Sequence, residues 1–281
     1  MSQPIRIQWA NETVQICKGG AYLGPRGRTV NLAGEIERAR AGTVIYSLEN
    51  PPPSLPHRGF GRTRIEVRNE TTFAALQRLA DGTGHVACLN FASAKHPGGG
   101  FLSGAQAQEE ALARSSALYA CLLCAPDYYD RNRANYSAIY LDLVIFSPMV
   151  PFFRNDSGEL LETPILASVI SAPAPNAGAV AQSEPGNMVL LEPAMRRRAE
   201  LVLRTAQGHG VDKLVLGAWG CGVFRNDPRM VARIFSELLS LPGPFDGVFT
   251  EVAFAVFDPS QEQATYNAFV GVLGNAGSDA W

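Results

Sequence analysis

The sequence HVACLNFASAKHPGGGFLSGAQAQEE, residues 85–110, combines an apolar segment, a glycine-rich loop and the start of a helix. Residues 85–91 are almost continuously apolar, which is typical of a strand buried on both faces in the middle of a sheet. We predict a helix from about residue 105 to residue 124. A strand, a loop and a helix in this order favour an α/β domain, whose ligands bind just past the carboxyl ends of the strands.

The same alternation of strands and helices extends along most of the chain. The patterns predict further strands over residues 42–46, 63–68, 139–147, 165–171, 212–217 and 248–257. They predict further helices over residues 5–18, 69–79, 191–208, 227–239 and 260–273. This spacing favours a three-layer α/β/α domain.

The proline- and glycine-rich stretch 51–64 separates an N-terminal segment from the rest of the chain. We therefore expect a helical and stranded segment over residues 1–60, packed on a larger α/β domain over residues 61–281.

Composition excludes several classes of protein. Of 281 residues, 46% are hydrophobic, which indicates a globular chain. The net charge of −2 argues against binding nucleic acid by charge alone. We find neither a run of about 20 apolar residues nor a signal peptide, and we expect a cytoplasmic protein. The five cysteines are expected to be free thiols, and the Cys121–Cys124 pair to pack in the core. The four histidines are scattered, so we expect no metal and no cofactor.

A second glycine loop, residues 217–224, follows another predicted central strand. Its free backbone amides suit phosphate oxygens, as do those of the triple glycine at residues 98–100. Each loop alone could be only a tight strand-to-helix turn. Two loops at equivalent places favour a cleft that binds a diphosphate. Neither loop has the pattern of a P-loop or of a dinucleotide-binding fingerprint.

The acidic pair Glu109–Glu110 begins the helix after the triple glycine, directly behind Gln108. Such a pair often does no more than complement the helix dipole. Neighbouring helical side chains diverge by about 100°, so one carboxylate can face the cleft while the other supports it. The helix N-terminus lowers a carboxyl pKa, whereas a general acid needs a raised one, so burial against the bound substrate has to outweigh the dipole.

Together these motifs resemble poly(ADP-ribose) glycohydrolases. Gly98, Gly99 and Gly100 followed after seven residues by Gln108-Glu109-Glu110 is similar to that family's signature. Residues 220–224 resemble its diphosphate loop and residues 90–93 its approach strand, although Ser93 stands where animal members carry Asn. The resemblance covers residues 60–275, is closest to the bacterial type, and implies a macrodomain-like mixed sheet and a role in the DNA damage response.

The resemblance implies a role for each candidate residue. Glu110 would be the general acid and then the base, and Glu109 would hold the ribose hydroxyls or the leaving unit. Asn90 would bind the terminal ribose, Phe224 would pack at the proximal ribose, and Phe257 would stack on adenine; a strand-end cap and two core aromatics are the alternatives. The remaining expected substrate contacts are Gly98, Gly99, Gly100, Gln108, Gly220, Cys221, Gly222 and Val223.

The expected partners are poly(ADP-ribose), ADP-ribose and poly(ADP-ribosyl)ated proteins. We expect a monomer that binds neither DNA nor membranes, and we expect Arg196, Arg197 and Arg198 to lie on a solvated helix face. The alternatives are a non-catalytic ADP-ribose reader, a mono(ADP-ribosyl) hydrolase, an ADP-ribose phosphatase and a nucleotide-dependent transferase. By its likeness to the bacterial type, the chain is expected to pack residues 5–18 as a helix beside the triple glycine, which would restrict cleavage to polymer ends.

Overall fold

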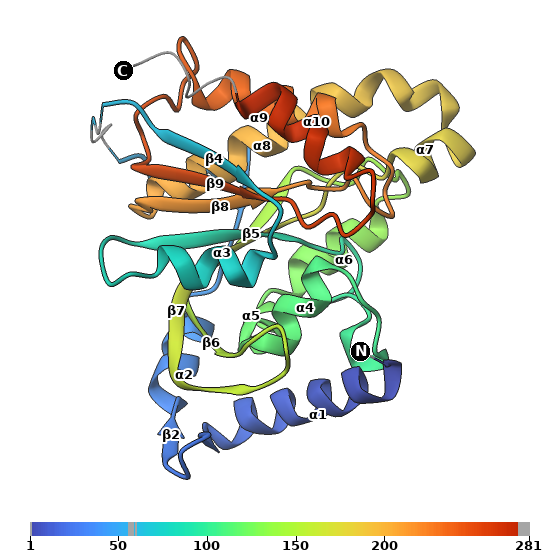
Figure 1. The fold of residues 1–281 in the computed structure, drawn as a ribbon. Coiled ribbons are helices and arrows are strands. Elements are labelled where there is room, and N and C mark those ends of the chain that lie inside the picture. The colour runs from blue at the N-terminus through green and yellow to red at the C-terminus, as the bar shows by residue number, and fades with distance from the viewer. Residues whose placement is uncertain (1, 56–58, 60, 275–281) are drawn as a thin grey trace.

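The computed structural model describes residues 2–55, 59 and 61–274. Part of the proline-rich stretch 51–64 therefore lies outside the described residues. Seven strands form one sheet in the order β3-β6-β7-β5-β8-β9-β4 (Figure 1). Their bounds are Val44–Ser47 (β3), Arg64–Arg68 (β4), Val86–Phe91 (β5), Leu143–Arg154 (β6), Leu160–Ala172 (β7), Lys213–Gly217 (β8) and Glu251–Ala255 (β9). The sheet is mixed, because β3 and β7 pair antiparallel with β6 whereas the remaining pairs are parallel.

Helices cover both faces of the sheet, so the predicted three-layer architecture is confirmed (Figure 1). One face packs against α8 (Leu191–Gly208), α9 (Pro228–Leu239) and α10 (Ala264–Leu273). The other face packs against α2 (Ala33–Ala41), α3 (Thr72–Leu79), α4 (Gln108–Ser115), α5 (Leu118–Leu122) and α6 (Pro126–Ala134). Leu89 of β5 belongs to the first core and its neighbour Cys88 to the second, because successive side chains of a strand point to opposite faces.

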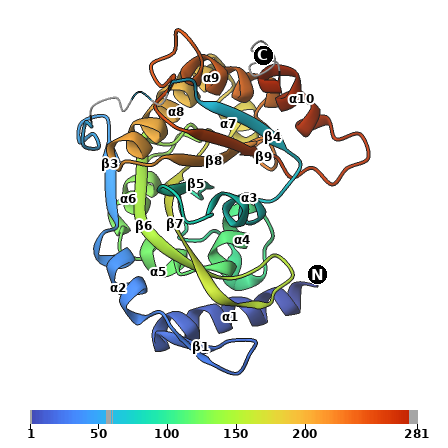
Figure 2. The ribbon, with the colours of Figure 1, turned by 60° about the vertical axis from the view of Figure 1, so that its left-hand side comes forward.

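The N-terminal segment begins with the predicted helix, α1 (Gln3–Gly19), which runs alongside α4 and α5 (Figures 1 and 2). A small hairpin of β1 (Ala21–Leu23) and β2 (Thr29–Asn31) follows, then α2. Neither the hairpin nor α2 was predicted. The predicted strand at residues 42–46 corresponds to β3, which extends the main sheet at the edge of β6.

The single helix predicted over residues 105–124 is instead two helices, α4 and α5, separated by one break. A 3₁₀ turn, η1 (Phe101–Ser103), precedes α4, and α4 ends at Ser115. Ser116 has extended backbone angles and bridges to Phe152 of β6 before α5 begins. This pairing with a distant strand stops a segment whose residues would otherwise continue a helix.

Other predicted boundaries also change. The strands β6 and β7 form a long hairpin that reaches well beyond the predicted ranges 139–147 and 165–171. Strand β9 is shorter than residues 248–257, and α10 begins at Ala264 rather than at residue 260. Besides β1, β2 and α2, the elements not predicted from the sequence are η1, α6, α7 (Ala177–Ser183) and η2 (Pro185–Leu190).

Of the three arginines predicted to lie on a solvated face, Arg197 is exposed, but Arg198 is fully buried. Its guanidinium pairs with Asp142 at 3.0 Å and donates to the carbonyl oxygen of Pro173 at 2.6 Å. A buried charge needs such partners, and these lie far away in the sequence. Of the Cys121–Cys124 pair, Cys121 is in the core as predicted, whereas Cys124 is exposed and Cys121 remains a free thiol.

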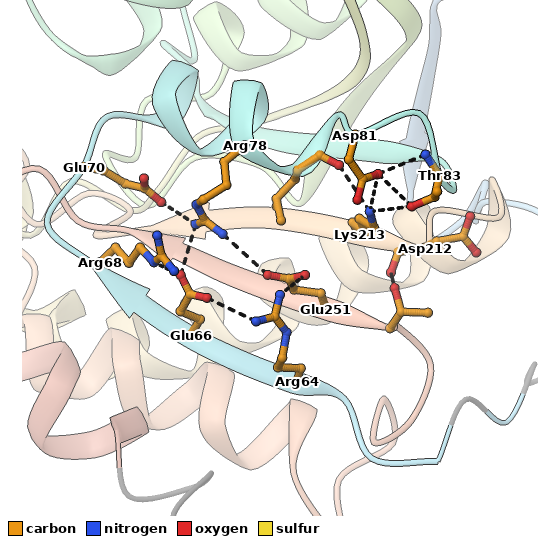
Figure 3. Close-up of polar contacts among 12 residues, drawn as sticks. Arg64, Glu66, Arg68, Glu70, Arg78, Asp81, Thr83, Asp212, Lys213 and Glu251 are labelled. Carbon is orange, nitrogen blue, oxygen red and sulfur yellow. Dashed lines mark hydrogen bonds and ion pairs between the residues drawn. The ribbon is translucent and has the colours of Figure 1, made fainter.

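A network of ion pairs fastens α3 to the β4 edge of the sheet (Figure 3). Arg78 of α3 reaches Glu70 at 2.5 Å, Glu66 of β4 at 3.2 Å and Glu251 of β9 at 3.6 Å. Arg64 also pairs with Glu251 from the other side. Since Glu251 is buried, these partners compensate the removal of its carboxylate from water.

Candidate active site

A cavity of about 770 Å³ opens where several strands end. Its lining includes Phe91 at the end of β5, Ala255 at the end of β9, and the loop after β8. Of the predicted site residues, those that line it are Gln108, Gly220, Cys221, Gly222, Val223, Phe224 and Phe257. This is the place where α/β sheets bind their ligands.

The triple glycine forms a turn that packs on both acidic side chains. Gly98 and Gly99 have φ angles of +68° and +58°, a region that favours glycine. A Cβ atom at Gly99 would overlap Oε1 of Glu110 and lie 3.1 Å from Oε2 of Glu109. The amide of Gly100 donates a 3.0 Å hydrogen bond to Oε1 of Glu110. The loop therefore fixes the Glu110 carboxyl with backbone groups alone.

Glu109 is a buried carboxyl, with only 3% of its surface exposed. The amide of Ser93 donates to Oε2 at 2.7 Å, and Nδ2 of Asn90 lies 3.4 Å from Oε1. Burial raises the pKa of Glu109 to about 8, although the amides of Ser93 and Gly98 and the Asn90 side chain act in the opposite direction. Burial thus outweighs these donors and the helix N-terminus at this position.

Gln108 joins α4 to the end of β5. Its Oε1 accepts from the amide of Phe91 at 2.8 Å, and its Nε2 donates to the carbonyl oxygen of Leu89 at 2.8 Å and to Oγ1 of Thr72 at 3.1 Å. The side chain continues the hydrogen bonding of the strand, so α4 has a fixed place relative to the sheet. The sequence suggested a substrate contact for Gln108, and the structure adds this anchoring role.

Asn90 is completely buried at the carboxyl end of β5. Its Nδ2 donates to Oγ of Ser171 at 3.0 Å, whereas Oδ1 has no hydrogen-bond partner among the described residues. Buried amide oxygens are rarely left without a donor. An acceptor of this kind next to Glu109 suits a hydroxyl group of a ligand.

In the second glycine loop, Gly220 is tightly surrounded by other residues, whereas Gly222 faces open space. Gly220 has a φ angle of +74°, and a Cβ atom there would overlap Ala174 and Asn226. A Cβ atom at Gly222 would meet nothing within 4 Å, and Val223 beside it is 84% exposed. The open backbone at Gly222 leaves room for a ligand to approach the chain.

Two aromatic residues lie along the cavity. The ring of Phe224 is 6.1 Å from that of Tyr140, and its carbonyl oxygen accepts from the amide of Gly178 at 3.0 Å. Phe257, just past β9, is 63% exposed, so it is not the core residue that the alternative interpretation required. Burial raises the pKa of the Cys221 thiol to about 12, which disfavours the reactive thiolate at neutral pH.

The structure brings the predicted residues together in two groups around Gln108. Asn90, Glu109, Glu110 and the triple glycine form a hydrogen-bonded cluster, and the second loop and Phe257 line the cavity. Sequence reasoning missed several lining residues, for which no local motif gave a signal: Trp9, Thr71, Arg114, Arg154 and Asp156. Trp9 comes from α1, Thr71 from the start of α3, Arg114 from α4, and Arg154 and Asp156 from the β6–β7 hairpin.

The described residues contain no group of three or more His, Cys, Asp and Glu side chains that could hold a metal ion. Nor does any helix among them have the length and apolar character needed to cross a bilayer.

Comparison with known proteins identifies the family. The model of the protein family described as microbial-type PARG, catalytic domain, matches residues 10–155. The crystal structure of poly(ADP-ribose) glycohydrolase from Thermomonospora curvata is 45% identical, with a TM-score of 0.89 over 95% of this chain and 98% of that one. A second structure of that enzyme, bound to the inhibitor ADP-HPD, is 46% identical, with a TM-score of 0.87 over the same shares of the two chains.

The enzyme from Deinococcus radiodurans in complex with ADP-ribose is 46% identical, with a TM-score of 0.80 over 88% of this chain and 99% of that one. Curated protein sequences give no match. The chain belongs to the microbial-type poly(ADP-ribose) glycohydrolase family.

Proposed function

We propose that this protein hydrolyses the ribose–ribose O-glycosidic bonds of poly(ADP-ribose) and releases ADP-ribose. The observation that carries the proposal is the arrangement of Glu110, whose carboxyl is held by the amide of Gly100 next to the buried Glu109. Family membership supports the same reaction. Two glycine loops and an adjoining cavity of about 770 Å³ offer space for a dinucleotide-sized ligand.

In the proposed mechanism Glu110 acts first as an acid. It donates a proton to the 2′-oxygen of the leaving unit while the bond from this oxygen to C1″ of the terminal ribose breaks. The positive charge that develops on the ribose is stabilised by the nearby diphosphate. Water then attacks C1″ and returns a proton to the Glu110 carboxylate, which restores the acid.

Glu109 and Asn90 are proposed to hold the terminal ribose. The raised pKa of Glu109, about 8, means that its carboxyl is largely protonated at neutral pH, so it can both donate and accept hydrogen bonds. The unpartnered Oδ1 of Asn90 accepts from a ribose hydroxyl in this arrangement. Both side chains bind and orient the sugar, which leaves the proton transfer to Glu110.

The diphosphate is proposed to lie between the two glycine loops. The loop over residues 98–100 and the loop over residues 220–224, with Cys221 and Val223, contact it through backbone amides. Phe224 packs at the proximal ribose and Phe257 stacks on adenine. The related structures support ADP-ribose as the ligand, since one contains ADP-ribose and another the inhibitor ADP-HPD.

We further propose that cleavage starts at polymer ends and spares the last, protein-linked ADP-ribose. Residues 1–60 form the accessory segment of the proposed division, and α1 contributes Trp9 to the cavity wall. The protein-linked unit has no ribose–ribose bond for Glu110 to address. Poly(ADP-ribosyl)ated proteins are the proposed substrates of a monomeric enzyme. Free cysteines support a cytoplasmic location, since reducing compartments keep thiols unpaired.

Product analysis tests the proposal. Long purified polymer should yield free ADP-ribose from the first time points, without long free oligomers, and a mono-modified protein should keep its label. Failure to release ADP-ribose would favour a non-catalytic reader, and removal of the single unit would favour a mono(ADP-ribosyl) hydrolase. The intact Glu109–Glu110 pair argues against the reader.

A further inference from the structure

Helix α1 contacts the segment that carries Glu109 and Glu110 at both of its ends (Figure 1). Before α4, Arg6 donates from Nε to the carbonyl oxygen of Gly104 at 2.6 Å and from Nη1 to Oε1 of Gln106 at 2.9 Å. After the acidic pair, the buried hydroxyl of Thr13 donates to the carbonyl oxygen of Arg114 at 2.6 Å. These contacts span about 100 residues of sequence.

Gln108 ties the first residue of α4 to β5, and the hydroxyl of Ser116 donates to the carbonyl oxygen of Leu112 at its other end, but two places in α4 have no such local partner. The residue before its first turn is Ala107, which has no side chain to cap the free amides. The carbonyl oxygen of Arg114 belongs to the last turn, where intrahelical partners are missing. The Thr13 hydroxyl provides that partner. A helix of 8 residues is not stable by itself, so its position depends on such tertiary contacts.

Two hydrogen bonds connect the neighbourhood of Gly104 to the carboxyl of Glu110. Gly104 has a φ angle of +76°, and a Cβ atom there would lie 2.9 Å from Gln3 and Ile7 of α1, so the two segments touch without a gap. The next residue, Ala105, donates from its amide to the carbonyl oxygen of Gly100 at 3.1 Å. Gly100 in turn donates to Glu110.

We propose that Arg6 and Thr13 are positioning residues that hold the turn 100–105 and α4 in place, and thereby set the position of the Glu110 carboxyl. This inference rests on the proposed role of Glu110. Arg6 and Thr13 act through the turn and the end of α4 that flank Glu110, so we expect their loss to lower turnover more than it weakens binding. Misplacing a catalytic group by about 1 Å costs on the order of 100-fold in rate.

Helix α1 keeps other attachments when one of these hydrogen bonds is lost. Glu12 pairs with the buried Arg154 at 2.7 Å, and the Arg154 guanidinium lies 5.6 Å from the centre of the Trp9 ring. Single substitutions at Arg6 or Thr13 should therefore leave the protein folded, with α1 still on the surface.

The test compares Thr13→Val, Arg6→Ala and Arg6→Lys with a matched control, Thr205→Val. Thr205 is also buried and donates from its hydroxyl to a carbonyl oxygen, that of Leu201 at 2.7 Å, but it lies in α8 on the other face of the sheet. For each variant, kcat and KM are measured with polymer, the Kd of ADP-ribose by calorimetry, and Tm by thermal unfolding.

We expect kcat to fall on the order of 10- to 100-fold in Thr13→Val and Arg6→Ala, while KM and Kd stay within about threefold. Arg6→Lys should recover part of the rate, because the amine can still reach the Gly104 carbonyl. Thr205→Val should lower Tm without changing kcat. A wild-type kcat in both Thr13→Val and Arg6→Ala, or an equal fall of kcat in Thr205→Val, would overturn the inference. A wild type without glycohydrolase activity would instead refute the proposed function.

Discussion

The amide of Gly100 and Oε1 of Glu110 are joined by a hydrogen bond of 3.0 Å, which ties the proposed acid to the triple-glycine turn. The contact works because Gly99 has no side chain. Any Cβ atom at position 99 would overlap the same carboxyl oxygen. The spacing between the glycines and the acidic pair thus has a direct steric reason.

Gly99→Ala should reduce turnover by about 100-fold or more, because the methyl group displaces the Glu110 carboxyl. The matched control is Gly27→Ala. Gly27 has a similar φ angle, +72°, but open space around its Cβ position, so it reports only the cost of the left-handed backbone. Gly99→Ala should lose at least as much stability as Gly27→Ala in thermal unfolding, because the overlap with Glu110 adds to the backbone cost. Equal activity in the two proteins would show that Gly99 does not position Glu110.

Glu109→Gln should change how stability depends on pH. The folded-state pKa of Glu109, about 8, lies above the unfolded value near 4.5, so the native state binds the extra proton between these values. The free energy of unfolding of the wild type therefore falls as pH rises from about 4.5 to 8, by on the order of 5 kcal/mol from this group. The glutamine side chain of Glu109→Gln cannot ionise, so this fall in the free energy of unfolding should be absent from the variant.

Denaturant unfolding of both proteins at pH 5 and pH 8.5 measures the effect. Glu109→Gln should gain stability relative to the wild type as pH rises, whatever constant offset the substitution introduces. A difference that stays the same at the two pH values would mean that Glu109 is ionised throughout.

Gly222→Val should weaken ADP-ribose binding at least 10-fold and leave Tm unchanged, because its side chain would enter open space that we assign to the diphosphate. Gly220→Ala should behave differently. Its Cβ atom would overlap Ala174 and Asn226 in a left-handed turn, so the fold itself should lose stability. Calorimetry and thermal unfolding of both variants separate the two effects. Unchanged affinity in Gly222→Val would place the ligand elsewhere.

Phe257→Ala should weaken ADP-ribose binding by about 1 to 3 kcal/mol, the usual contribution of an aromatic ring stacked on a base. Its stability should be close to that of the wild type, since the side chain is 63% exposed. Leu23→Ala, at a residue 66% exposed in the N-terminal hairpin, is the control for loss of a surface side chain. If the two variants bind ADP-ribose equally well, adenine does not stack on Phe257.

Local patterns were enough to predict the centre of the fold. The apolar runs at residues 86–91 and 213–217 indicate buried parallel strands without any knowledge of their neighbours, and both are central in the sheet. The two glycine loops and the acidic pair could likewise be recognised as candidate site residues from local sequence alone. Each is a short motif whose chemistry depends on spacing along the chain.

Features set by distant contacts could not be predicted. The break at Ser116 depends on its bridge to Phe152, and the burial of Arg198 depends on Asp142 and the Pro173 carbonyl. An arginine-rich helix suggests a solvated face unless these partners are known. The attachment of α1 to both ends of α4 likewise joins residues about 100 positions apart.

The activity of Glu110→Gln, measured beside its affinity for ADP-ribose, tests the central claim most directly. The substitution keeps the size of the side chain and an oxygen that can accept from Gly100, but it removes the proton that the leaving oxygen needs. Release of ADP-ribose from polymer should fall by on the order of 100- to 10,000-fold or more, while the Kd of ADP-ribose stays within a few fold of the wild type. Glycohydrolase activity close to that of the wild type in a clean preparation would contradict the assignment of Glu110 as the general acid.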